Sequence, residues 1–283
     1  MNNIINALSV DVEDYYHVSA FSNVIKKHEW SNYESRVYEN TMELLDLFDD
    51  AKVKSTFFVL GMVAEKHPNI IREIVNRNHE VACHGYSHDM ITKQSPSLFR
   101  EESIKAKKIL EEQAQTEVIG YRAASFSITN KSLWALDVLS ELGFKYDSSV
   151  FPVRHDRYGI PDAPYEPYKI DTGNGKSIVE FPMTIKKLVN INIPIGGGGY
   201  FRIYPYFITK LLLKIINEKE NRPFVFYLHP WEIDPKQPRI AASLFSTFRH
   251  YTNLHKCKSR LISLVDDFSF TSIRDTLSHL ELV

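Results

Sequence analysis

The sequence predicts an α/β protein with a parallel sheet or barrel, and three observations support this. Strand-like and helix-like segments alternate along the chain, which is typical of parallel strands joined by helices. Polar side chains directly follow at least four of the apolar strand-like segments, as they do in sites built on the carboxyl ends of parallel strands. Finally, the chain has 283 residues, 43% apolar and 24% charged, which predicts one large domain, or at most two, with a substantial core.

Apolar, β-branched runs predict the strands. The first of these runs ends in a cluster of acids, and the last apolar one ends in a histidine. The expected strands cover residues 4–12, 54–60, 79–84, 118–122, 145–150, 178–181 and 223–229, with a further β-like stretch at 268–273. Residues 151–175 are rich in Pro, Asp and Tyr, and we expect them to form a long ordered loop.

Capping patterns and the helical spacing of apolar residues predict the helices. Asn40 with Glu43 forms a capping-box pattern, and Ser95 followed by Pro96 is a strong N-cap and first-turn pattern. The expected helices start at Asn40 or cover residues 68–77, 95–115, 130–142 and 205–220, and two or three more follow residue 239. The four glycines at 196–199 lack the pattern of a phosphate loop and predict a flexible or closely packed loop.

Charge and composition narrow the function classes. The formal net charge is −1, and we expect no nucleic-acid partner because phosphate binding needs an excess of Lys and Arg. Two cysteines, Cys83 and Cys257, cannot form a disulfide framework and favour a reducing compartment. Met1 to Asn6 lacks the features of a signal peptide, and no apolar run approaches the ~20 residues that span a bilayer. We therefore expect a cytoplasmic protein without a membrane span, although removal of a leader would leave the same sequence.

The spacing of two histidines indicates a site for a divalent metal. His84 and His88 are four residues apart and can share one ion, although surface histidines in a loop would show the same spacing. Asp11 and Glu13 point to the same side of the first strand, while Asp14 lies where that strand ends. Two imidazoles and a carboxylate are a common catalytic zinc or iron set. One acid can therefore bind the metal while Asp11 remains free as a base, and a solvated acidic turn is the alternative.

Three further polar residues follow other predicted strands. Arg122 can pair with Asp11 and keep that carboxylate ionised, or it can pack on Tyr121 at the surface. Asp147 can orient His229 by a hydrogen bond, as a carboxylate orients a catalytic imidazole. The alternative for His229 is a core histidine with satisfied hydrogen bonds. In a barrel the carboxyl ends of the strands converge, so we expect these side chains to meet on one face.

Five motifs occur in a characteristic order. They are the Asp11-Val12-Glu13-Asp14 start, His84-Gly85-Tyr86-Ser87-His88, Gly120 to Phe126, Tyr146-Asp147-Ser148-Ser149, and Phe226-Tyr227-Leu228-His229. In this order the chain resembles the polysaccharide deacetylase family, also called carbohydrate esterase family 4 or the NodB-homology domain. The resemblance implies a distorted (β/α)7-type barrel as the catalytic domain over residues 1–235, with a helical C-terminal extension over residues 236–283 packed on the same domain.

Further stretches resemble one subfamily, which is encoded beside exopolysaccharide and exosortase-type loci. They are Asp11 to Tyr16, Gly198 to Arg202, His229 to Pro235, Gln237 to Arg239 and Phe248 to Leu254. The resemblance implies a metal-dependent hydrolase that removes N-acetyl groups from N-acetylhexosamine units of a bacterial polysaccharide or its precursor. Its partner would be that N-acetylated glycan, and the oligomeric state stays open.

The resemblance also implies the roles of individual residues. His84 and His88, with Glu13 or Asp14, would bind a divalent metal, most simply zinc, with cobalt, nickel or iron as alternatives. The family's adjacent Asp-Asp is replaced here, and the direction of the strand side chains favours Glu13 over Asp14.

The remaining motif residues would act on protons. Asp11 would serve as the base, positioned by Arg122. His229, oriented by Asp147, would protonate the leaving amine. The proline common after the third-motif arginine is absent, which leaves the shape of that loop open.

Aromatic side chains near these motifs are candidates for stacking on sugar rings, and each is also a plausible core residue. They are Tyr15, Tyr16, Phe126, Phe151, Tyr200 and Trp231. Two other functions remain alternatives to the deacetylase. One is a metal-independent, allantoinase-like amide or ring hydrolase on the same fold, and the other is a non-catalytic glycan-binding module.

Overall fold

A mostly parallel sheet forms the centre of the protein. The computed structural model describes residues 4–155, 158–173, 175–189 and 191–283. Residues 1–3, part of the Met1 to Asn6 stretch for which we predicted no signal peptide, lie outside the described residues. The sheet pairs in the order β10-β1-β2-β3-β4-β5-β7-β6, and β11 also pairs with β1. Its strands are β1 (Ile5–Val12), β2 (Thr56–Val59), β3 (Glu80–Cys83), β4 (Gly120–Tyr121), β5 (Tyr146–Asp147), β6 (Tyr168–Asp171), β7 (Ser177–Glu180), β10 (Val225–Leu228) and β11 (Ser269–Thr271). The hairpin of β8 (Ile185–Leu188) and β9 (Ile191–Pro194) forms a separate small sheet.

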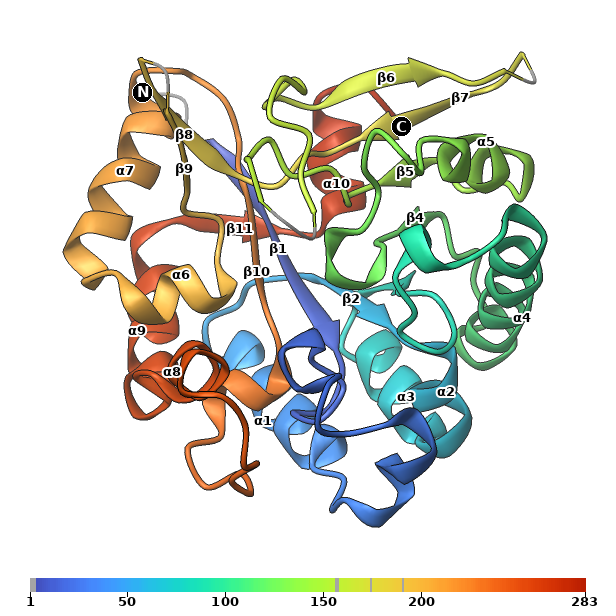
Figure 1. Ribbon diagram of the computed structural model, residues 1–283. Coiled ribbons are helices and arrows are strands. Elements are labelled where there is room, and N and C mark those ends of the chain that lie inside the picture. The colour runs from blue at the N-terminus through green and yellow to red at the C-terminus, as the bar shows by residue number, and fades with distance from the viewer. Residues whose placement is uncertain (1–3, 156–157, 174, 190) are drawn as a thin grey trace.

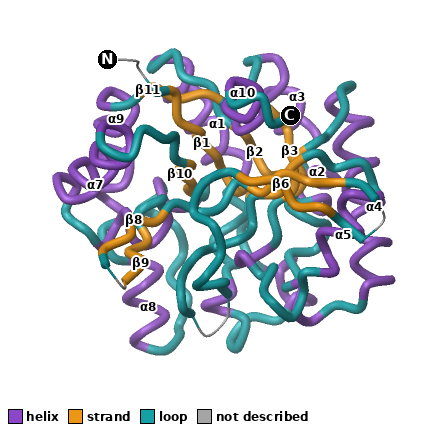
Figure 2. Tube along the Cα trace, turned by 90° about the horizontal axis from the view of Figure 1, so that it is seen from above, coloured by secondary structure: helices purple, strands orange, loops and turns teal. Residues whose placement is uncertain are grey.

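Helices surround the sheet, as the view from above in Figure 2 shows. They are α1 (Val37–Asp50), α2 (Gly61–Lys66), α3 (Pro68–Asn76), α4 (Pro96–Ala114), α5 (Trp134–Glu141), α6 (Gly198–Ile203), α7 (Tyr206–Glu218), α8 (Leu244–Tyr251), α9 (Leu254–Asp267) and α10 (Ile273–His279). Every residue of β2, β3 and β10 is buried, as expected for parallel strands covered on both faces. The α/β fold class predicted from the sequence is therefore confirmed.

An irregular segment after β7 returns to the other end of the sheet. The Thr184 hydroxyl donates to the carbonyl of Val225 over 2.7 Å, and the Tyr227 amide donates to the carbonyl of Gly196 over 2.8 Å. Gly197 has a φ of 123°, and a Cβ at this residue would lie 1.9 Å from the Tyr227 carbonyl oxygen. The glycine run is thus a closely packed loop, and this segment bridges β7 and β10 where a regular strand would close a barrel.

Several element boundaries differ from the sequence predictions. The helix expected to start at Asn40 begins at Val37, and Asn40 is buried inside α1, where its amide donates to Asp234 over 3.4 Å. The predicted loop over 151–175, of which residues 156, 157 and 174 lie outside the described part, contains β6. The N-cap at Ser95 is confirmed, since its hydroxyl accepts from the Leu98 amide.

The C-terminal tail packs against the same sheet as the N-terminal strand. Strand β11 pairs in parallel with the first half of β1, and β2 pairs in parallel with its second half (Figure 1). The division of the chain at residue 235 stays a prediction. Within the described residues, we find no helix with the length and apolar character needed to cross a bilayer.

Candidate active site

Polar side chains from the carboxyl ends of β1, β3 and β10 line one cavity. The cavity has a volume of about 160 Å³. Its lining includes Asp11, Glu13, His84, His88 and His229. Parallel strands place their carboxyl ends at the same edge, so residues far apart in sequence converge there.

Arg122, directly after β4, fixes the position of Asp11. Its side chain is fully buried, and Nη1 donates to Asp11 Oδ1 over 2.7 Å and to Ser9 Oγ over 2.9 Å. Nε and Nη2 donate to the carbonyl and hydroxyl oxygens of Ser148, both over 2.9 Å. The guanidinium therefore has acceptors on three sides, and the expected contact with Asp11 is present. This leaves Asp11 Oδ2 directed towards His229, whose Nε2 lies 4.0 Å away.

Glu13, His84 and His88 form a group that could hold a metal ion. One ligand atom from each lies within 4.8 Å of the others. The Nδ1 atom of His84 lies 2.8 Å from the carbonyl oxygen of Arg122, which orients this ring and leaves its Nε2 for a ligand. His88 has a φ of 56°, a left-handed conformation that is uncommon for a residue with a side chain and recurs at functional sites.

The charge and hydrogen bonding of this group fit a cation. Burial lowers the pKa of the His84 imidazole, which favours the neutral form that binds metals. Burial alone would raise the pKa of the Glu13 carboxyl, but the imidazoles of His88 and His229 hold it well below its usual range. Glu13 Oε2 is buried, and His88 Nε2 lies 2.7 Å from it. A carboxylate and two imidazoles in this arrangement suit zinc or a similar ion.

Asp14, the alternative carboxylate, faces away from this group. Its oxygens accept from the Ser35 hydroxyl over 2.7 Å and from the Arg36 amide over 2.9 Å. Burial raises the pKa of the Asp14 carboxyl. The structure thus brings Glu13, and not Asp14, to the two histidines.

The sequence predicted that Asp147 would orient His229, but in the structure Glu232 holds this ring. The Nδ1 atom of His229 lies 2.8 Å from Glu232 Oε1, and the other carboxylate oxygen accepts from Arg202 Nε over 2.5 Å. Arg202 is 2% exposed and also donates to carbonyl oxygens of the extension, at Arg249, His250 and Thr252. On the cavity side, His229 Nε2 is 3.2 Å from Glu13 Oε1.

The charges in this chain of contacts support one another. Burial alone would raise the pKa of Glu232, but the Arg202 guanidinium and the His229 ring lower it to about 2. Burial alone would lower the pKa of His229, but Glu13 and Glu232 raise it to about 9. Glu232 therefore stabilises the protonated imidazole. The sequence contained a pattern that could have identified Glu232, since a polar residue followed three positions later by Glu is typical of a capping box.

Asp147 belongs to a different buried cluster. Its oxygens accept from the Ser149 hydroxyl over 2.7 Å and from the Ser149 amide over 3.1 Å. Burial raises the pKa of Asp147, and burial together with the Asp147 charge raises the pKa of Glu180 well above its usual value. Two buried carboxyls in contact cannot both be ionised, so this pair holds a proton and supports the loop beside Arg122.

The predicted sugar-stacking aromatics divide into two groups. Phe126 and Trp231 line the cavity, and the Trp231 ring lies between His229 and His250, at centroid distances of 5.1 and 4.2 Å. Tyr15 is fully buried in the core, and Tyr200 packs beside Tyr204 with a centroid distance of 6.0 Å. Tyr15 is thus a core residue in this structure. Two lining residues that the sequence did not reveal, His155 and Tyr158, come from the long segment after β5.

Comparison with family models divides the chain in two. Residues 23–146 match polysaccharide deacetylase, and residues 148–278 match a domain of unknown function, DUF3473. The first match includes His84, His88 and Arg122, and the second includes His229 and Glu232.

Individual relatives match over shorter stretches. A peptidoglycan-N-acetylglucosamine deacetylase of Bacillus cereus is 42% identical over 72 residues, 25% of this chain and 26% of the relative. A chitooligosaccharide deacetylase of Bradyrhizobium sp. is 28% identical over 100 residues, 35% of this chain and 43% of the relative. The matches therefore span less than half of the length of these curated relatives.

Solved structures share the fold. One from Mycobacterium smegmatis, described as a polysaccharide deacetylase, has a TM-score of 0.64 at 19% identity and covers 99% of this chain and 90% of that chain. An allantoinase has the same TM-score at 16% identity and covers 98% and 89%. At these identities the likeness concerns the fold alone. The family match, which the curated relatives support, shows that residues 23–146 belong to a polysaccharide deacetylase domain of carbohydrate esterase family 4, the NodB-homology type.

Proposed function

We propose that this protein is a metal-dependent hydrolase that removes N-acetyl groups from N-acetylhexosamine units of a bacterial polysaccharide, such as an exopolysaccharide, or its precursor. One observation carries the proposal. Glu13, His84 and His88 lie together in a cavity that also contains Asp11, paired with Arg122, and His229. These residues would supply three metal ligands, a positioned base and a positioned acid around one cavity.

A divalent ion bound by Glu13, His84 and His88, which we propose to be zinc, would polarise the acetamide carbonyl and lower the pKa of a water molecule. Asp11, held by its contact with Arg122, takes the proton of the attacking water. A fixed base avoids the entropy loss of bringing a free carboxylate to the water.

His229 faces the same cavity from β10 and protonates the leaving nitrogen. This step is needed because an amine anion cannot leave at neutral pH. Glu232 keeps Nδ1 occupied, so Nε2 is the atom that faces the cavity and carries the transferred proton. Arg202 in turn anchors Glu232, which makes both positioning residues for His229.

Acetate release from N-acetylglucosamine oligomers tests the proposal. We expect release that stops on chelation and returns with added zinc, and that falls at least about 10²-fold in Asp11→Asn and His229→Ala. The exposed substitution Glu43→Gln serves as a control for handling and should retain activity. Activity that survives both chelation and His84→Ala would favour the allantoinase-like alternative, and wild-type rates in Asp11→Asn would contradict the assigned base.

A further inference from the structure

A second and larger cavity adjoins the candidate active site. Its volume is about 820 Å³, against about 160 Å³ for the cavity around His229. The two cavities share four lining residues, namely Ser19, Ala20, His155 and Tyr158. A chain held in the larger cavity can therefore continue into the smaller one, where the reaction is proposed to occur.

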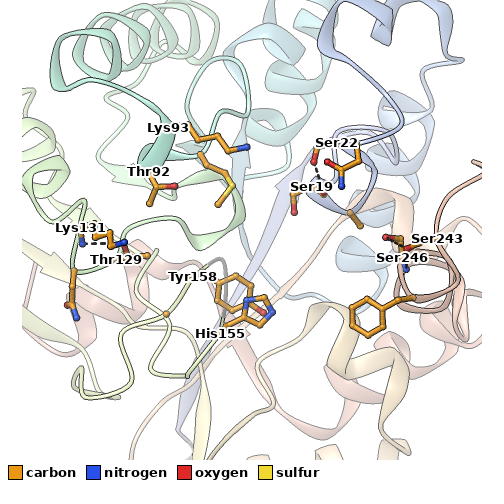
Figure 3. A pocket seen from close by; sticks show the side chains of 16 residues that line it. Ser19, Ser22, Thr92, Lys93, Thr129, Lys131, His155, Tyr158, Ser243 and Ser246 are labelled. Carbon is orange, nitrogen blue, oxygen red and sulfur yellow. Dashed lines mark hydrogen bonds between the residues drawn. The ribbon is translucent and has the colours of Figure 1, made fainter.

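The described residues that line the larger cavity are mostly polar and include two lysines. Figure 3 shows Lys93 and Lys131 on different segments around it, with Ser243 and Ser246 facing them from the α8 side. Its other hydroxyl and amide side chains come from Ser19, Ser22, Asn23, Thr92, Thr129 and Asn130. No aspartate or glutamate is found among the described residues that line it. Asp89, the acid on the same loop as Lys93, is engaged by Lys27 over 2.5 Å.

An exposed aromatic ring completes the lining. Phe245 on α8 is 65% exposed although it borders the cavity. An aromatic ring on an otherwise polar wall suits the apolar face of a sugar ring, while the hydroxyls around it suit the sugar's polar edge. The lining therefore combines side chains that can bind sugar hydroxyls, stack on a sugar ring and pair with a negative charge.

We propose that this cavity binds an anionic stretch of the glycan whose N-acetylated unit occupies the neighbouring active site. Lys93 and Lys131 pair with carboxylates of sugar-acid units, and Phe245 stacks on one of the rings. The substrate is thus an acidic N-acetylated polysaccharide, bound over several units. This inference rests on the proposed function and adds the charge of the substrate to it.

The test compares two oligosaccharides with one backbone. The first alternates N-acetylglucosamine and glucuronate, and the second is the same chain with its carboxyl groups reduced to alcohols. Binding of each is measured by calorimetry to the Asp11→Asn protein, so that turnover does not interfere. We expect the charged chain to bind about 4- to 25-fold more tightly, because an exposed ion pair contributes roughly two- to fivefold per lysine.

Variants of the lysines decide the cause of any preference. In the Asp11→Asn background, Lys93→Ala with Lys131→Ala should remove the preference, and raising the salt concentration should weaken it in the unmodified pair. A control pair at exposed lysines elsewhere, Lys108→Ala with Lys258→Ala, should preserve it. With Asp11 intact, Lys93→Ala with Lys131→Ala should keep the urea-unfolding midpoint of the wild type, which shows that the fold is retained.

Two results would overturn the inference and leave the proposed function standing. One is equal binding of both chains, and the other is a preference for the charged chain that survives the double lysine substitution. The proposed function fails separately if the wild-type protein releases no acetate from any N-acetylated oligomer with zinc present. Phe245→Ala should weaken binding of both chains by a similar factor, since stacking does not depend on the carboxylates.

Discussion

Glu232→Gln separates two explanations of how the acid His229 is positioned. In the wild-type protein, Glu232 Oε1 accepts from the backbone amide of His229 over 3.1 Å and contacts its Nδ1 over 2.8 Å, while Oε2 binds Arg202. A glutamine preserves the size of the side chain but replaces one carboxylate oxygen with a donor. If the oxygen stays on Arg202, the amide group faces Nδ1 and favours the ring form with its proton on Nε2 and no charge.

The expected losses follow from these contacts. General acid catalysis contributes about 10²- to 10⁴-fold, so kcat should fall by at least about 10²-fold while KM changes little. Stability should fall by about 1–3 kcal/mol, because the hydrogen bonds are weakened but the side chain stays packed. Glu232→Ala should cost about 3–5 kcal/mol, since it leaves the buried Arg202 charge without its carboxylate. Steady-state acetate release and urea unfolding measure the two effects separately.

Asp147→Asn is the matched comparison. Asp147 contacts Ser149 and Glu180 instead of His229, so this variant should keep kcat within a few-fold of wild type. Glu232→Asp, which retains the charge on a shorter side chain, should recover part of the activity lost in Glu232→Gln. The reasoning is refuted if Glu232→Gln keeps the wild-type kcat while Asp147→Asn loses it.

Two further predictions concern stability. Gly197→Ala should lower the free energy of unfolding in urea by more than about 3 kcal/mol, because the new Cβ would lie 1.9 Å from the Tyr227 carbonyl oxygen. Gly143 also has a positive φ, 88°, but has open space around it, so Gly143→Ala should cost only about 1–2 kcal/mol. Equal losses in the two variants would contradict this prediction. The pKa of Glu180 is raised in the folded state, so its contribution to stability is full below its unfolded pKa near 4.5 and is lost as pH rises. Above that pH, the stability of Glu180→Gln relative to wild type should therefore rise by up to about 1.4 kcal/mol per pH unit. A stability difference between the two proteins that does not change with pH would contradict the prediction.

Local and motif-based patterns predicted the framework of the site. The helix start at Ser95 depends on contacts within one turn, and the histidines at 84 and 88 follow a fully buried strand, so a single sequence is enough to indicate them. The contact between Arg122 and Asp11 was expected because both residues end parallel strands. These are features for which sequence spacing determines position in space.

Tertiary contacts explain the differences. Asn40 has the right spacing for an N-cap, but it lies inside α1, and its side-chain amide donates to Asp234, nearly two hundred residues away. Asp147 follows a strand of the same parallel sheet as His229, which made it a candidate to orient that ring. Its carboxyl group instead contacts Ser149 and Glu180. Glu232 replaces it because a 3₁₀ turn at Pro230–Ile233 returns the chain to His229 immediately after β10.

The position of β1 has a consequence for how the chain reaches its native state. This strand carries Asp11 and leads into Glu13, yet its partners β10 and β11 are synthesised more than two hundred residues later. The Asn6 amide, for example, donates to the carbonyl of Ser269 across 263 positions. A nascent chain lacking β10 and β11 would expose one whole side of β1 as an unpaired edge, open to pairing with other chains. Such distant pairings also slow folding, so we expect the site to be assembled late and in one step with the arrival of the C-terminal strands.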